Sequence, residues 1–175
     1  GCECYGWTNW QEAETDVRAL LARKVMGSLR VLALVRNNST TSISAPDSFI
    51  DHGVVADKMG IRFTYMNLHE FVDQTHECDP SENPSLPGRV ENNITAEEAA
   101  EIERMTDELV ACACEVDMPK ENVAKSMKAH VLTKKLLAKT GCNGFTAPCP
   151  DMCATRRLNE EQFTLCLTHS LNNEC

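Results

Sequence analysis

A short apolar run from Leu29 to Val35 constrains the fold of this chain more than any other segment. The run is rich in Val and Leu and hardly alternates between apolar and polar residues, which is typical of a strand covered on both faces. Such strands occur mainly in the parallel sheets of α/β proteins, where helices cover both sides of the sheet. We therefore expect Leu29 to Val35 to form the first strand of a parallel sheet.

Helical and strand patterns alternate around this run. Apolar residues at helical spacing from Trp10 to Arg23 predict a helix that buries one face, with Thr8 as its N-cap. After the first strand, residues 46–59 predict a second helix, because Pro46 suits a first turn and Gly60 suits a C-cap. Residues 61–68 then predict a second strand.

The second half of the chain continues the alternation. Residues 95–116 predict a long helix that opens with a capping box at Thr95. Residues 119–139 predict a further helix, which Gly141 ends and whose lysines form a solvated face or a subunit contact. Residues 142–149 predict a third strand, and residues 159–171 a final amphipathic helix. Alternating strands and helices indicate an α/β fold, a Rossmann-like three-layer sandwich with a parallel sheet.

Charge and composition bear on the partners and the compartment. The chain carries a formal net charge of -9, which repels phosphate backbones and anionic lipid, so we expect neither nucleic acid nor a membrane as a partner. No apolar run approaches the roughly 20 residues that cross a bilayer. The ten cysteines lie mostly inside apolar runs, as Cys112, Cys114 and Cys166 do, where a thiol behaves as a small hydrophobe. We expect a reduced, cytoplasmic protein.

The loops that follow the strands hold the candidate ligand-binding residues. In open parallel sheets, ligands bind at the carboxyl ends of the strands. Asn37 follows the first strand, and Cys149 and Asp151 follow the third, in a loop that leads to a helix N-terminus and so favours polar ligands. We therefore predict substrate contacts at Asn37, Cys149 and Asp151. A nucleophilic Cys149 would also need a nearby base and a lowered pKa, and the sequence shows neither.

Two common kinds of site are not expected. The first strand is not followed by the Gly-x-Gly-x-x-Gly turn that lets backbone approach a pyrophosphate, which argues against NAD binding. His69 and Glu70 lack the second histidine, four residues after the first, that a zinc protease needs. His76 and Cys78 have no second ligand pair at metal spacing. We predict no metal ligand within the chain.

Three stretches of the chain carry a likeness to one known family. They are the helix of residues 10–23 leading into 29–36, residues 47–60 leading into 62–68 and His69-Glu70-Phe71, and the closing residues 149–174. On these stretches the whole chain resembles the middle segment of the fucose isomerase-like superfamily, which includes L-fucose and L-arabinose isomerases. The glycine common in that family after the first strand is replaced here by the stretch Asn37-Asn38-Ser39.

The resemblance implies a fold, a reaction and a place in a longer protein. Residues 1–175 would form a single Rossmann-like second domain, incomplete at its C-terminus, with residues 1–28 as a helix entering from the preceding domain. The catalytic glutamate, with an aspartate and a histidine that hold manganese or a similar divalent cation, would lie beyond Cys175, so the resemblance assigns no catalytic residue here. The whole protein would be a homo-oligomer that interconverts an aldose and a ketose, with a monosaccharide such as L-fucose or L-arabinose as substrate. This chain alone would be inactive.

A second hypothesis stays open on the residues themselves. No catalytic constellation is recognisable within the chain, and a Rossmann-like fold serves many functions. The chain is therefore also compatible with a non-catalytic module that binds or senses a small molecule.

Overall fold

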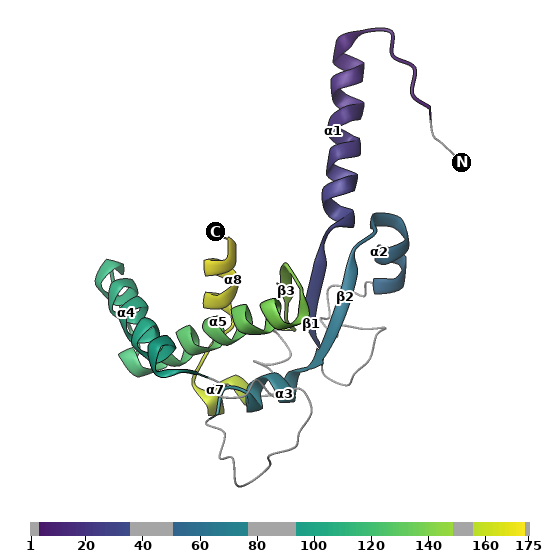
Figure 1. Ribbon diagram of the computed structural model, residues 1–175. Coiled ribbons are helices and arrows are strands. Elements are labelled where there is room, and N and C mark those ends of the chain that lie inside the picture. The colour runs from purple at the N-terminus through teal and green to yellow at the C-terminus, as the bar shows by residue number, and fades with distance from the viewer. Residues whose placement is uncertain (1–3, 36–50, 77–93, 149–155, 174–175) are drawn as a thin grey trace.

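Three parallel strands form the sheet in the computed structural model, which describes residues 4–35, 51–76, 94–148 and 156–173. Strand β1 (Arg30–Val35) lies in the middle, between β2 (Arg62–Asn67) and β3 (Gly144–Thr146) (Figure 1). In the register of the sheet, Val35 lies opposite Asn67, and Ala33 lies opposite Thr146. The predicted parallel sheet and the α/β arrangement of helices around it are confirmed at this level.

The central strand is as buried as its sequence predicts. Residues 32–35 of β1 are almost completely inaccessible to solvent, whereas β2 at the edge is only half-buried. Strand β3 is shorter than the predicted 142–149. The reason is local, because the amide of Cys142 donates to the carbonyl of Leu137 at 3.0 Å and so completes the end of the preceding helix. The strand begins only after Asn143, whose side chain accepts the amide of Arg30 at 2.8 Å.

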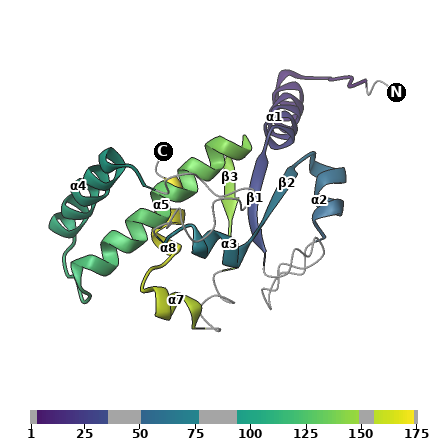
Figure 2. The same ribbon diagram turned by 60° about the horizontal axis from the view of Figure 1, so that its bottom comes forward.

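The described ranges contain seven helices in addition to the sheet. They are α1 (Trp10–Gly27), α2 (His52–Met59), α3 (Leu68–Asp73), α4 (Ala96–Cys112), α5 (Lys120–Thr140), α7 (Arg157–Glu161) and α8 (Cys166–Asn173). Helix α5 packs beside β3, α2 beside β2, and α4 lies against α5 on the side away from the sheet (Figure 2). Lys135 of α5 donates to Glu98 of α4 at 2.8 Å, and Lys120 pairs with Asp107. Part of the lysine stripe therefore joins two helices rather than facing solvent alone.

Helix boundaries that depend on local signals agree with the sequence. Thr95 and Glu98 form the predicted capping box at the start of α4. Gly60 ends α2 and Gly141 ends α5, both in the left-handed conformation, with φ values of 77° and 65°. Glycine adopts this conformation without the steric penalty that other residues carry. These signals work because each acts within one turn of the chain.

Other helix boundaries differ from the prediction. The N-cap of α1 is Asn9, whose side chain accepts the amide of Glu12 at 2.9 Å, and Thr8 donates its hydroxyl to the Glu12 carboxylate instead. The N-cap of α2 is Asp51, so that helix begins at His52 rather than at residue 46. Helix α4 ends at Cys112, four residues before the predicted end at Val116. In each case a nearby side chain or backbone group provides the better cap.

The predicted final helix over 159–171 is wrong, because the chain breaks at Gln162. That residue has a φ of 59°, which ends α7, and α8 begins only at Cys166. Phe163 and Leu165 lie between the two helices and are both buried in the core. The amide of Thr164 donates to the Ser126 hydroxyl on α5 at 3.0 Å, which holds this link against α5. The break places the side chains of Phe163 and Leu165, two alternate residues of the link, in the core.

The apolar face predicted for α1 is present but not buried. Helix α1 stands away from the sheet, and only its C-terminal end comes near α2 (Figure 1). Trp10 is 83% exposed, Val17 53% and Leu21 59%, and Ala13 is the only buried residue of this helix. The expectation that this face packs on the rest of the described chain is therefore wrong.

The cysteines also differ from the prediction. Cys112, Cys114 and Cys166 are exposed, because each lies near the end of a helix rather than on its packed face, whereas Cys142 is buried. All four are free thiols, as is Cys4. None of the helices within the described ranges is long and apolar enough to cross a membrane.

Three histidines are predicted to make stability depend on pH. Burial lowers the pKa of His52, His130 and His169, and Lys134 lowers that of His130 further. As the pH falls through about 6.5, the unfolded chain therefore takes up protons before the folded protein does. We expect the free energy of unfolding to fall between about pH 7.5 and pH 5.5, by about 1.4 kcal/mol for each unit by which a pKa is lowered.

Urea unfolding at several pH values tests this expectation in the wild type and in His130→Leu. His130 is 3% exposed, and its Nδ1 has no hydrogen-bond partner among the described residues, so leucine removes a buried polar atom as well as a titrating group. The variant should show a shallower pH dependence, whereas Thr64→Leu, which changes no titrating group at an exposed position, should keep that of the wild type. An unchanged slope in His130→Leu would contradict the prediction.

Candidate functional site

The order of the strands places the candidate site at one end of the sheet, where the strands finish. From β1 the chain crosses to β2 on one side, and from β2 it returns past β1 to β3 on the other side. Where successive crossovers leave a parallel strand in opposite directions, the loops at the carboxyl ends separate and open a crevice for ligands. This switch point lies between the carboxyl ends of β1 and β3.

The three predicted ligand-binding residues follow the two strands that flank this switch point. Asn37 comes shortly after β1 ends at Val35, and Cys149 and Asp151 come shortly after β3 ends at Thr146. All three lie outside the described residues, so contacts among them stay a prediction. The described part of the site is the pair of strand ends from which these loops depart.

Other polar groups at this end of the sheet lie at and after the end of β2. The Asn67 side chain accepts the amide of His69 at 2.8 Å and so caps the short helix α3. His69 is exposed and Glu70 is half-buried, while Phe71 and Val72 point into the core. Sequence reasoning missed Asn67 as a cap, although an asparagine directly before a helical segment is the usual signal.

The described residues do not form a metal site. No group of three His, Cys, Asp or Glu side chains in the described ranges lies close enough to hold a metal ion. The Nε2 of His76, considered above with Cys78, lies 2.8 Å from the carboxylate of Glu161 in α7, and Cys78 lies outside the described ranges. The manganese ion that the resemblance implies therefore has no ligand set among the described side chains.

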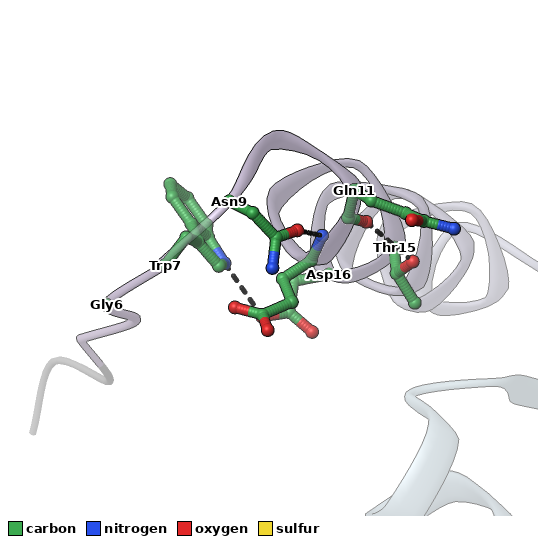
Figure 3. Close-up of a pocket in the computed structure, with 7 residues that line it drawn as sticks. Gly6, Trp7, Asn9, Gln11, Thr15 and Asp16 are labelled. Carbon is green, nitrogen blue, oxygen red and sulfur yellow. Dashed lines mark hydrogen bonds between the residues drawn. The ribbon is translucent and has the colours of Figure 1, made fainter.

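A polar hollow lies at the other end of the molecule, beside the start of α1 (Figure 3). It measures about 440 Å³ and is lined by Gly6, Trp7, Asn9, Gln11, Glu12, Thr15 and Asp16. The Trp7 indole donates to Asp16 at 2.8 Å, and the hydrogen bonds from Thr8 hold the pKa of Glu12 below its usual value. Asn9 and Glu12 take part in capping α1. The start of the helix therefore accounts for much of the polarity of this hollow.

Comparison with known proteins identifies no relative, so any functional proposal for this chain rests on its fold and on the switch point. The chain matches no protein-family model, and no curated protein matches it significantly. The structure defines an α/β protein with a small parallel open sheet, whose strand order places a potential ligand crevice between β1 and β3.

Proposed function

We propose that this chain is a Rossmann-like domain that binds a small polar molecule between the carboxyl ends of β1 and β3. The observation that carries the proposal is the parallel strand order β2-β1-β3, because it creates a switch point at the central strand. In this proposal the described sheet is the core of a three-layer sandwich, with further strands beyond the described edges. Asn37, Cys149 and Asp151 supply the polar contacts.

The chemistry of these residues favours a neutral polyol as the ligand. An asparagine amide both donates and accepts hydrogen bonds, and an aspartate accepts several, so the pair matches the hydroxyl groups of a sugar. The net charge of -9 disfavours anionic ligands such as phosphate esters. A free monosaccharide such as L-fucose or L-arabinose fits both requirements.

We further propose that the domain belongs to an aldose–ketose isomerase. The support is that the helix–strand pairs carrying the family resemblance are formed in this fold. Helix α1 leads into β1, α2 leads into β2, and His69, Glu70 and Phe71 follow β2 directly in α3. Interconversion of an aldose and a ketose moves a proton between neighbouring carbons, and carboxylates are suitable bases for this step. In our proposal those carboxylates lie outside this chain, which orients the sugar and excludes water.

The proposed compartment is the cytoplasm. The support is that the exposed cysteines Cys4, Cys112, Cys114 and Cys166 are free thiols. Exposed thiols persist in reducing compartments and tend to oxidise elsewhere.

Calorimetric titration of the protein with L-fucose and L-arabinose tests the binding proposal. We expect Asp151→Asn and Asn37→Ala each to weaken binding about tenfold, because a hydrogen bond to a charged or polar group contributes on the order of 1.4 kcal/mol. Asp57→Asn, on the exposed side of α2, makes the same change of charge elsewhere and should bind as the wild type does. Equal affinity in all variants would contradict the site.

A second assay separates the isomerase from a non-catalytic module. The longer protein that the resemblance implies is incubated with each aldose and manganese, and the ketose is measured. Ketose formation supports the isomerase. Binding at Asn37 and Asp151 without any ketose would support a regulatory module.

A further inference from the structure

Helix α1 carries an exposed apolar stripe along most of its length. Each apolar residue of the stripe lies three, four or seven positions from another member, and all are between 38% and 83% exposed: Trp10, Val17, Leu20, Leu21 and Val25. This spacing places them on one side of the helix. A contiguous apolar patch of this kind on a soluble surface marks an interaction site more often than scattered apolar residues do.

The acidic residues of α1 precede its basic residues. Glu12, Glu14 and Asp16 lie in the first half and Arg23 and Lys24 in the second, while Arg18 at the middle pairs with Glu14 of the same helix at 2.7 Å. Two copies of this helix side by side in the same direction would place like charges together. When the two helices run in opposite directions, the acidic end of each copy faces the basic end of the other. The dipoles of antiparallel helices also attract each other.

We propose that α1 pairs antiparallel with α1 of a second copy of this chain, around a two-fold axis near Val17 and Leu20. A two-fold interface uses the same surface on both copies, so the self-complementary charge pattern of α1 is the pattern that it requires. With Val17 of one copy beside Leu20 of the other, the heptad positions place Asp16 of each copy near Arg23 of its neighbour.

A groove at the start of α1 has a matching occupant in this arrangement. The groove measures about 630 Å³ and is lined in part by Trp7, Trp10, Ala13 and Val17. In the antiparallel register, Lys24 of the second copy, one heptad after Val17, lies beside Ala13 and can extend its side chain between the two tryptophans. Ala13, at the base of the groove, leaves room for that side chain.

The proposed dimer does not depend on the proposed function. Helix α1 leads into the amino end of β1, whereas the candidate ligand site lies at the carboxyl ends of the strands (Figure 1). The two surfaces are at opposite ends of the sheet, so a failure of one proposal leaves the other intact. Helix α1 is about 27 Å long, and an interface along it falls in the weak class below roughly 1,200 Å², so we expect dimers from about 10 µM upward.

Sedimentation velocity of the full chain over a range of concentrations tests the dimer. The wild type, 19.4 kDa as a monomer, should shift to twice that mass as its concentration rises. Val17→Asp places a charge at the centre of the stripe and should weaken the dimer at least tenfold. Ala19→Asp makes the same kind of change on the opposite, exposed side of α1 and should dimerise as the wild type does. A chain that is monomeric throughout, or equal behaviour of the two variants, would overturn the proposal.

A charge-exchange experiment tests the antiparallel direction. The double variant Glu14→Lys, Asp16→Lys leaves Glu12 as the one acidic residue of α1, and Arg23→Glu, Lys24→Glu leaves Arg18 as its one basic residue. Each variant alone should dimerise about tenfold more weakly, and an equimolar mixture should regain wild-type association. Recovery on mixing also shows that both variants are folded. Two variants that each dimerise like the wild type, or a mixture that stays monomeric, would overturn the antiparallel arrangement.

Discussion

Replacing Phe71 with alanine is expected to lower the free energy of unfolding by about 3–5 kcal/mol. Phe71 is completely buried and is the largest of the fully buried side chains described. It anchors the short helix α3 in a core that includes Leu32 and Leu34 of β1 and Leu136 of α5, and its ring lies 6.3 Å from that of Phe145. Alanine leaves a cavity beneath the central strand that these neighbours fill only in part. The loss is a large fraction of the roughly 5–15 kcal/mol that stabilises a typical domain.

Urea unfolding followed by far-ultraviolet circular dichroism measures this loss. Tryptophan fluorescence is a poorer probe, because Trp7 and Trp10 are exposed and lie far from this core. His69→Ala alters an exposed residue of the same helix and should change the free energy of unfolding by no more than about 0.5 kcal/mol. A cost below about 1 kcal/mol for Phe71→Ala would mean that α3 does not seal the core as described.

Gly60→Val is expected to destabilise the protein by about 2–3 kcal/mol, for two separate reasons. The first is conformational, because the φ of 77° at Gly60 is strained for a β-branched residue. The second is steric, since a Cβ at this position would lie 3.1 Å from the Cα of Gly27, at the end of α1. The neighbouring atom belongs to the backbone, so relief requires that α1 and α2 move apart.

Gly141→Val separates these two causes. Gly141 also has a left-handed φ, of 65°, but a Cβ there would meet no atom within 4 Å. This control should therefore lose only the conformational part, about 1–2 kcal/mol, in the same unfolding experiment. Equal losses at the two glycines would show that the close approach of Gly27 and Gly60 contributes nothing.

The sequence predicted the features that depend on neighbouring residues. The unbroken apolar run of β1 predicted a strand buried on both faces, the capping box at Thr95 predicted the start of α4, and Gly60 and Gly141 predicted two helix ends. Each of these signals acts within a few residues, through a hydrogen bond, a backbone conformation or the spacing of side chains. They are therefore readable without knowledge of the rest of the chain.

The candidate site was only partly predictable. The sequence indicated that loops after parallel strands would bind a ligand, and it singled out Asn37, Cys149 and Asp151. It could not show which of these strands are neighbours, because strand order depends on how distant segments pack. The observed order, with β3 directly beside β1, brings the two relevant strand ends together.

By itself, the sequence determined the three strands, most of the helices, the parallel class of the sheet and the apolar stripe of α1. Only the tertiary structure decided which apolar faces are buried and which stay exposed. It broke the last helix at Gln162 so that Phe163 and Leu165 enter the core, and it left the stripe around Val17 exposed. The physical reason is that helical periodicity specifies which face is apolar but not what covers it. Burial depends on contacts between residues far apart in the chain, and only the folded arrangement supplies those contacts.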